Sequence, residues 1–216
     1  MAYSFPEGSK FYFSTTFAAT KTLSAMTNAN PTVATSVSHG YSDNDELLLV
    51  SGWEDATNTV YRADQLTADT VSLLGLNTVS TTFFASGGGA SSTTAKISSW
   101  TEIPQVLTIA TSGGDPRYTT ISPLSRRNAI QVPTGFNSTS VTLTLGHDPA
   151  DANYQTMLGI SRALTLVAFK MTLGGGGTSY GYGYMATNEV PSLSVNQANT
   201  VTAAFTLLGR SISYAT

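Results

Sequence analysis

Residues 138–173 read STSVTLTLGHDPADANYQTMLGISRALTLVAFKMTL, and this stretch decides the fold class. From Thr139 to Leu145, the positions occupied by Thr139, Val141, Leu143 and Leu145 alternate with Ser or Thr. A period of two is typical of a β-strand with one apolar face and one polar face. The stretch therefore begins with a strand that belongs to a sheet with one wet side.

A short helix is predicted directly after this strand. Asp148 is a residue type that caps helix N-termini, and Pro149 suits the first helical position because it needs no N–H donor there. The apolar residues that follow fall near one side of a helix of about three to four turns: Ala150, Ala152, Tyr154, Met157, Leu158 and Ile160. Arg162 suits the negative C-terminal end of the helix dipole. A second strand is predicted from residue 164, ending at the glycines 174–177.

The composition favours a protein that packs permanently against other protein. Charged residues are only 11% of the 216 residues, and the polar residues are largely Thr and Ser, which number 34 and 26. Thr favours strands and lacks the long flexible side chains of Lys and Glu. A net charge of −3 gives no basic field for gripping nucleic acid.

Several classes of function lack their sequence signals. With no cysteine there is no disulfide, thiolate metal site or cysteine nucleophile. Residues 1–7, MAYSFPE, have neither a basic nor an apolar signal region, so we expect no signal peptide. No apolar run reaches the length of a membrane span. We predict no enzyme activity, no cofactor, no catalytic or cofactor-binding residue and no metal site.

The remaining chain reads as short strands separated by turns. We expect strands at 11–17, 32–38, 46–51, 58–64, 70–74, 96–100, 103–111, 117–122, 179–187, 190–195 and 200–214, the last bent at Gly209, and an exposed loop at 123–133. Residues 85–94 read as a linker. Residues 21–91 carry two bases and seven acids, whereas the rest of the chain carries eight bases and six acids. The fold class is mainly β, with one helix and a small barrel of about five strands before the linker.

The order of these pieces resembles the tail tube proteins (major tail proteins) of long-tailed, non-contractile bacteriophages. The residues that carry the resemblance are WTEIPQV at 100–106, TSGGD at 111–115, LTL at 143–145 leading to Asp148 and Pro149, EVPSL at 189–193 and VTAAFTLLGR at 201–210. Separately, SHGY at 38–41, Asp45, VSGW at 50–53, Asn58 and VYR at 60–62 are similar to a small β module inserted in many phage structural proteins.

The resemblance implies two packed antiparallel sheets with one flanking helix. It implies one discontinuous core domain, residues 1–20 and 92–216, interrupted by an inserted β module at 21–91. It also implies a structural virion protein whose hexameric rings stack in a helical assembly around a channel for genome ejection. Its partners would be itself, the tape measure, tail tip and terminator proteins, and DNA passing non-specifically, without membrane insertion. It would reside in the virion tail, after assembly in the host cytoplasm. The family's channel is typically acidic, whereas here we expect mostly Thr and Ser there, with the bases in loops between rings.

Each candidate site has a simpler structural interpretation. His39 and His147 are about a hundred residues apart, and Asp148 with Asp151 suits a helix N-terminus better than an acid–base pair. The glycines 174–177 and the GYG of 181–183 predict a hairpin tip and a strand, because a phosphate cradle needs a following helix. Arg126 and Arg127 favour a solvated or subunit-contacting loop. Asn137 begins a glycosylation-type triplet, which means little without secretion.

The leading hypothesis is the main subunit of a phage tail tube, with residues 103–133 and both termini as contacts between rings. The alternative is a β-sandwich carbohydrate-binding or adhesin module, in which Trp53, Trp100 or the tyrosines at 180, 182 and 184 would stack on sugars. A hydrolase is the least supported class, because no set of nucleophile, base and orienting group is visible.

Overall fold

The computed structural model describes residues 7–215, so Met1–Pro6 and Thr216 lie outside it. The described chain has one helix and seventeen strands, all of whose pairings are antiparallel. The elements are β1 (Lys10–Ser14), β2 (Lys21–Thr22), β3 (Ala25–Met26), β4 (Thr32–Thr35), β5 (Glu46–Val50), β6 (Thr59–Gln65), β7 (Thr70–Leu74), β8 (Thr93–Lys96), β9 (Thr101–Glu102), β10 (Val106–Ser112), β11 (Pro116–Ile121), β12 (Ile130–Phe136), β13 (Ser140–Gly146), α1 (Ala152–Ala163), β14 (Leu166–Thr172), β15 (Thr178–Thr187), β16 (Thr200–Leu207) and β17 (Ile212–Tyr214). The mainly β prediction is confirmed.

The larger sheet has eight strands, two of which, β13 and β14, come from residues 138–173. Its order is β10-β13-β16-β15-β14-β1-β9, with β17 paired to the first part of β15. Gly183 lies opposite Leu207 in the β15–β16 ladder, where a side chain at 183 would run into the backbone carbonyl of Thr206. Glycine therefore allows these two strands to approach closely.

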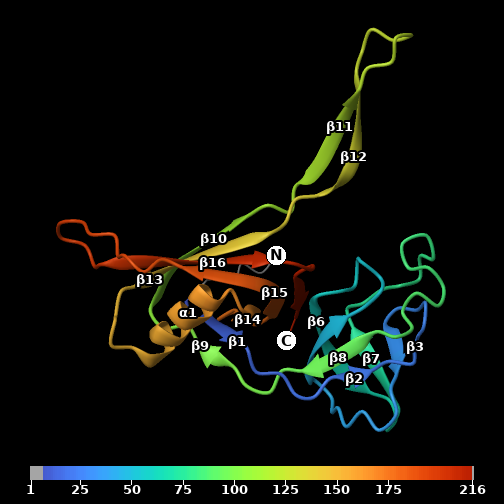
Figure 1. The fold of residues 1–216 in the computed structure, drawn as a ribbon, viewed down its shortest axis with the longest axis horizontal. Coiled ribbons are helices and arrows are strands. Elements are labelled where there is room, and N and C mark those ends of the chain that lie inside the picture. The colour runs from blue at the N-terminus through green and yellow to red at the C-terminus, as the bar shows by residue number, and fades with distance from the viewer. Residues whose placement is uncertain (1–6, 216) are drawn as a thin grey trace.

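Helix α1 covers one face of this sheet, and the main core lies between them (Figure 1). Tyr154, Met157, Leu158 and Ile160 are the buried side chains of the helix, as their spacing predicts. They pack against the inward residues of the strands, which include Phe13, Leu143, Phe169, Met185 and Phe205. The predicted flanking helix is confirmed, although Ala150 and Ala152 are exposed.

The start of the helix differs from the prediction. Asp148 does not cap it, because its carboxylate accepts the N–H of Ala150 at 3.0 Å in the preceding turn. Asp151 is the N-cap: its backbone is extended, and its carboxylate accepts the N–H of Tyr154 at 2.8 Å. Pro149 therefore lies in the turn before the helix rather than at its first position. At the other end, Arg162 lies in the last turn, as predicted.

The second sheet has seven strands in the order β2-β8-β5-β6-β7-β4-β3 and has its own core. The small closed barrel predicted here is not found in residues 7–215. The end strands β2 and β3 have two residues each and pair with β8 and β4, and no ladder joins them to each other. The predicted strand at 96–100 is also wrong, because the strand is β8 and pairs with β5 inside this sheet.

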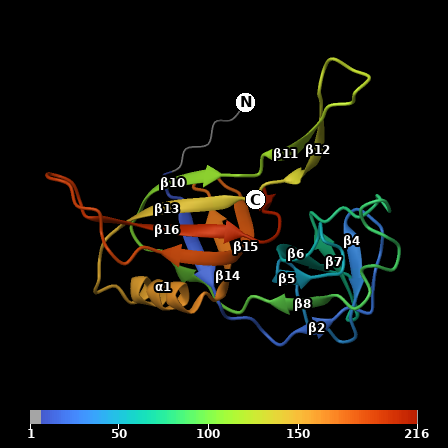
Figure 2. The same cartoon turned by 45° about the horizontal axis from the view of Figure 1, so that its top comes forward.

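The two sheets pack against each other on the side opposite the helix. Leu48 and Val60 of the smaller sheet contact Ala168, Tyr180 and Tyr182 of the larger one. The smaller sheet covers only part of that face, and β10, β13 and β16 extend beyond it (Figure 2). The two packed sheets with one helix therefore agree with the predicted architecture.

Two segments leave the body of the molecule, and both were predicted differently. Residues 123–133 are not simply a loop, because β12 pairs with β11 in a hairpin that projects as an arm (Figures 1 and 2). Residues 190–195 are not a strand but part of an exposed loop, held at its base by a single bridge between Ser192 and Thr200. Both segments expose apolar side chains that no described part of the chain covers.

Candidate assembly surfaces

The two histidines lie in different sheets and have ordinary structural roles. The His39 ring is buried, accepts the N–H of Tyr41 at Nδ1 (2.9 Å), and lies 3.1 Å from the carbonyl of Thr67 at Nε2. His147 lies in the turn before α1 and packs edge-on against Tyr154. Within residues 7–215, no group of three metal-ligating side chains is found, and no helix is long and apolar enough to span a membrane.

The aromatic residues proposed as a sugar platform are mostly buried. Trp53 is 3% exposed and donates its indole N–H to the carbonyl of Ala85 at 2.9 Å. Trp100 and Tyr180 lie between the two sheets, and Tyr182 is buried there as well. Tyr184 alone among them is exposed. These rings therefore offer no shared stacking surface, which counts against the carbohydrate-binding alternative.

The glycine-rich and basic segments also lie at turns. Residues 174–177 form the hairpin between β14 and β15, with positive φ at Gly176 and Gly177, and a strand follows them rather than a helix. Arg126 and Arg127 lie in the exposed loop at the tip of the arm. Asn137 lies at the base of the arm, where its N–H donates to the carbonyl of Asp115 at 2.9 Å.

A polar cluster surrounds Glu46 of β5, at the junction of the sheets. The Glu46 carboxylate accepts from the Tyr180 hydroxyl (2.6 Å) and the Lys170 ammonium (3.2 Å), and also from the Trp100 indole N–H. Burial, and then the hydrogen bond to Glu46, raise the pKa of Tyr180. This cluster helps to hold one sheet on the other, because one carboxylate accepts from all three of its donor side chains.

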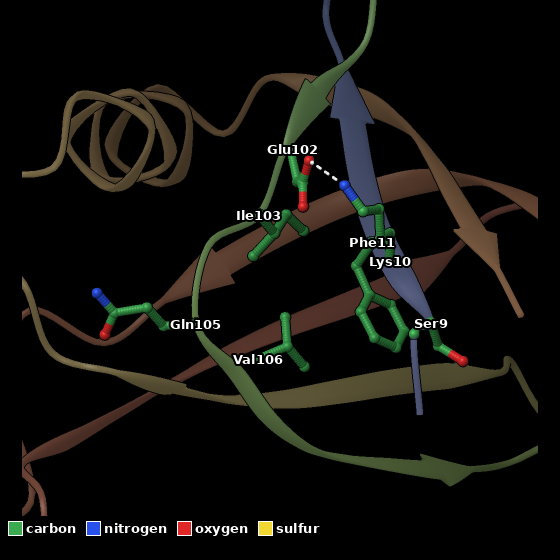
Figure 3. Close-up of a pocket in the computed structure, with 8 residues that line it drawn as sticks. Ser9, Lys10, Phe11, Glu102, Ile103, Gln105 and Val106 are labelled. Atoms are coloured by element: carbon green, nitrogen blue, oxygen red, sulfur yellow. Dashed lines mark hydrogen bonds and ion pairs between the residues drawn. The ribbon is translucent and has the colours of Figure 1, made fainter. Parts of the chain in front are cut away.

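A shallow pocket of about 310 Å³ marks the place where the two ends of the larger sheet approach (Figure 3). The chain passes from β9 at one end of the sheet to β10 at the other through residues 103–105. Phe11 and Val106 line the pocket, and an exposed ion pair of 3.3 Å joins Lys10 and Glu102 at its margin (Figure 3). The sheet curls almost round the core, and a seam remains between β1 and β10.

One free edge of the larger sheet is β10, and the two-residue strand β9 ends the sheet on the other side. Among the described residues β10 pairs with β13 on one side, and its other side has no ladder partner. Leu107 and Ile109 on this strand are exposed. A long unpaired edge with apolar side chains is a template for pairing with another chain.

The arm presents apolar side chains on both of its faces. The register places Ile121, Ile130 and Val132 on one face, and Tyr118, Pro133 and Phe136 on the other. All of them are exposed, and so is Leu124 at the tip. A two-stranded ribbon is marginally stable alone in water, and exposed apolar surface of this kind marks protein contacts.

The loop between β15 and β16, residues 188–199, is a third apolar surface. Val190, Leu193 and Val195 are 80%, 69% and 90% exposed. The sequence predicts contacts at 103–133 but not in this loop, because the apolar alternation at 190–195 predicts a strand there. The signal was present as the apolar residues themselves, next to Pro191 and the turn at 196–199.

Comparison with known proteins agrees with this surface chemistry. Residues 51–216 match the profile of a family described as phage tail tube protein, TTP. No curated protein matches the chain. The chain is similar to the subunit of the SPP1 tail tube, solved by solid-state NMR and cryo-EM, with 14% identity, a TM-score of 0.42, and coverage of 55% of this chain and 69% of that chain. Because the family profile spans most of the chain, the protein belongs to the phage tail tube protein family and is a structural subunit of the virion tail.

Proposed function

We propose that copies of this chain join edge to edge into rings, hexameric as the family resemblance implies, and that the rings stack into a hollow tube through which the genome passes. Assembly would occur in the host cytoplasm, with the tape measure, tail tip and terminator proteins as further partners. The protein would act by assembly and not by catalysis. The observation that carries this proposal is the free edge of β10 next to a projecting arm with two apolar faces.

The free edge supports ring closure. The β10 backbone offers N–H and C=O groups on its outer side, and pairing with a neighbouring copy would satisfy them. Burial of Leu107 and Ile109 in the same contact would add about 1.5–3 kcal/mol for each fully buried side chain. The seam pocket beside Val106 lies next to this edge and would be covered by the same neighbour.

The arm and the 188–199 loop support stacking of rings. In the β13–β16 ladder the arm begins beside the Ser140–Thr206 pair, whereas the loop ends beside the Gly146–Thr200 pair. The two apolar segments thus leave opposite ends of the same strands (Figures 1 and 2). Contacts that differ at the two ends of a subunit are head-to-tail, and such contacts build open filaments rather than closed particles.

We also propose the division into domains that the sequence suggests, with residues 1–20 and 92–216 as the tube core and residues 21–91 as an inserted module. Two separate cores support this division. The pairing of β8 with β5 favours a second boundary a few residues later, near Lys96. The inserted module would decorate the outside of the tube.

Electron microscopy of the purified protein tests the assembly. We expect hollow tubes at high protein concentration. A variant in which residues 118–133 are replaced by a short Gly-Asn turn should fold, because the arm adds nothing to the buried core, but should form no tubes. Wild-type protein that stays monomeric at every concentration and salt would contradict the proposal, and so would tubes formed without the arm.

A further inference from the structure

One half of a sheet face carries no ionisable group apart from a tyrosine. The outward positions of β10, β13 and β16, with the end of β15, share one side of the sheet by register. These positions are Thr108, Ala110, Ser112, Ser140, Thr142, Thr144, Gly146, Thr200, Thr202, Ala204, Thr206, Tyr184 and Ala186. We call this set the hydroxyl face. None of the thirteen is Asp, Glu, Lys, Arg or His.

Among the described residues, the hydroxyl face is the side of β13 and β16 that meets water. Their opposite side holds Val141, Leu143 and Phe205, which are buried under α1. The smaller sheet covers the neighbouring part of the same side, at Ala168 and Tyr180. Because the sheet curls almost round the core, this covered part points away from the hydroxyl face. Its residues are exposed or half-buried in the described chain.

The charged side chains of this region lie around the hydroxyl face and not on it. Asp115, Arg117, Arg126 and Arg127 belong to the arm and its base. Arg162 and Glu189 form an ion pair of 2.7 Å beside the helix. Lys10, Glu102 and Lys170 share the sheet side by register, but they belong to the other half of the sheet, on β1, β9 and β14. Lys170 is tied to Glu46 under the smaller sheet. In a chain with 23 charged residues, an uncharged area that spans four strands is a defined feature.

We propose that the hydroxyl face is the channel wall of the assembled tube and that double-stranded DNA passes it without electrostatic attraction or repulsion. This inference rests on the proposed tube assembly. It differs from the acidic channel that the family resemblance implies. The free edge of β10 borders the hydroxyl face, so edge-to-edge joining of copies would continue the same face from subunit to subunit.

The chemistry of the wall suits a passing polyanion. Non-specific DNA binding comes from Lys and Arg that displace counterions from phosphates, and it weakens steeply with salt. A wall without Lys or Arg does not bind the phosphates in this way, and a wall without Asp or Glu does not repel them. Hydroxyl groups hydrogen-bond to water, so the DNA would slide along a hydrated surface at any ionic strength.

The position of the wall can be tested because the chain has no cysteine. Thr142→Cys places a single thiol in the middle of the hydroxyl face, and Thr82→Cys, in an exposed loop of the smaller sheet, is the matched control. Both are labelled after assembly with a gold-cluster maleimide and imaged by cryo-EM. We expect gold inside the channel for Thr142→Cys and outside for Thr82→Cys. Gold outside in the first case overturns this inference while the tubes themselves support the proposed function.

The neutrality of the wall needs a second measurement. Tubes are assembled with short duplex DNA, treated with nuclease, sedimented and assayed for protected DNA at low and high salt. Wild type should retain almost none at either salt, Thr142→Lys should retain protected DNA that high salt releases, and Thr82→Lys should retain none that resists nuclease. Salt-sensitive protection in wild type overturns the inference. Ala110→Lys repeats the test if Thr142→Lys does not assemble, and failure of wild type to form tubes overturns the proposed function and this inference with it.

Discussion

The hydroxyl of Tyr180 on β15 donates a 2.6 Å hydrogen bond to the carboxylate of Glu46 on β5, which joins two sheets whose strands lie 134 residues apart in the sequence. The side chains of Glu46 and Lys170, which lie 3.2 Å apart, are both more than four-fifths buried. Glu46 is therefore one of several links between the two sheets, beside the apolar contacts of Leu48 and Val60 and the Tyr214 hydroxyl, which donates to the carbonyl of Leu74 at 2.7 Å. This relationship leads to the first two predictions.

Glu46→Gln should destabilise the protein by about 2 kcal/mol, because it removes the charge that pairs with Lys170 and leaves a buried donor unsatisfied. Equilibrium urea unfolding measures the change. The control is Lys10→Gln, whose pair with Glu102 is about half exposed and should contribute less than about 1 kcal/mol. Equal losses in the two variants would contradict a structural role for Glu46.

Alkaline pH should weaken the fold. Burial raises the pKa of Tyr180 above its ordinary value of 10.0, and the hydrogen bond to Glu46 adds to this. The folded protein then holds the proton more tightly than the unfolded chain, so the stability is complete below pH 10 and falls as the pH rises above it. Burial also raises the pKa of Tyr61 and Tyr214, so they add to the slope.

Urea midpoints between about pH 9 and 11 test this dependence. Tyr180→Phe should be less stable at neutral pH, because it loses its hydrogen bond, but its stability should fall less steeply with pH. Tyr118→Phe, on the exposed arm, should leave the slope unchanged. If the stability of Tyr180→Phe fell as steeply with pH as that of wild type, Tyr180 would not be a source of the pH dependence.

The sequence predicted those parts of the fold whose residues find their partners within the chain. The spacing of Tyr154, Met157 and Leu158 located the helix, and the alternation through Leu143 located β13, because both patterns match the buried faces seen in the structure. The alternation at 190–195 wrongly predicted a strand, because its apolar residues have no packing partner within residues 7–215. Apolar periodicity reports a need for burial and does not say which chain supplies it.

The sequence also left the start of the helix undecided, because two nearby residues of the same type could cap it. Asp148 and Asp151 are both good helix caps, and only the backbone between them decides that Asp151 holds the Tyr154 N–H. The hydroxyl face could be anticipated as a Thr-rich strand surface, but its extent across four strands depends on the order of the sheet. That order pairs β10 with β13 and not with its neighbour in sequence, the arm.

Asp151→Ala should cost about 1 kcal/mol of stability through loss of the helix cap. Asp148→Ala should cost less, because its carboxylate holds only the turn N–H of Ala150. Urea unfolding compares the two variants. A larger loss for Asp148→Ala would contradict the assignment of Asp151 as the helix cap.

Two glycines should respond in opposite directions to substitution by alanine. A Cβ at Gly159 meets open space on α1, so Gly159→Ala should stabilise the protein by roughly 0.5–1 kcal/mol. A Cβ at Gly183 meets the backbone of Thr206, which cannot move without disturbing the β15–β16 ladder, so Gly183→Ala should cost about 1–3 kcal/mol. Thermal or urea unfolding measures both, and the same sign in both variants would contradict the close approach of these strands.

The 188–199 loop should matter for assembly and not for folding. Changing Leu193 and Val195 together to Ser should leave the free energy of unfolding within about 0.5 kcal/mol of wild type, because both side chains are exposed in the subunit. If another ring buries them, loss of about 1.5–3 kcal/mol per side chain should raise the critical concentration for tube formation at least tenfold.

Val37 and Val79 of the smaller sheet are similarly exposed, and changing them to Ser should leave this concentration unchanged. Sedimentation across a protein dilution series measures it, and a rise of the same size in both double variants would mean that the effect reflects general surface polarity and not a contact of this loop.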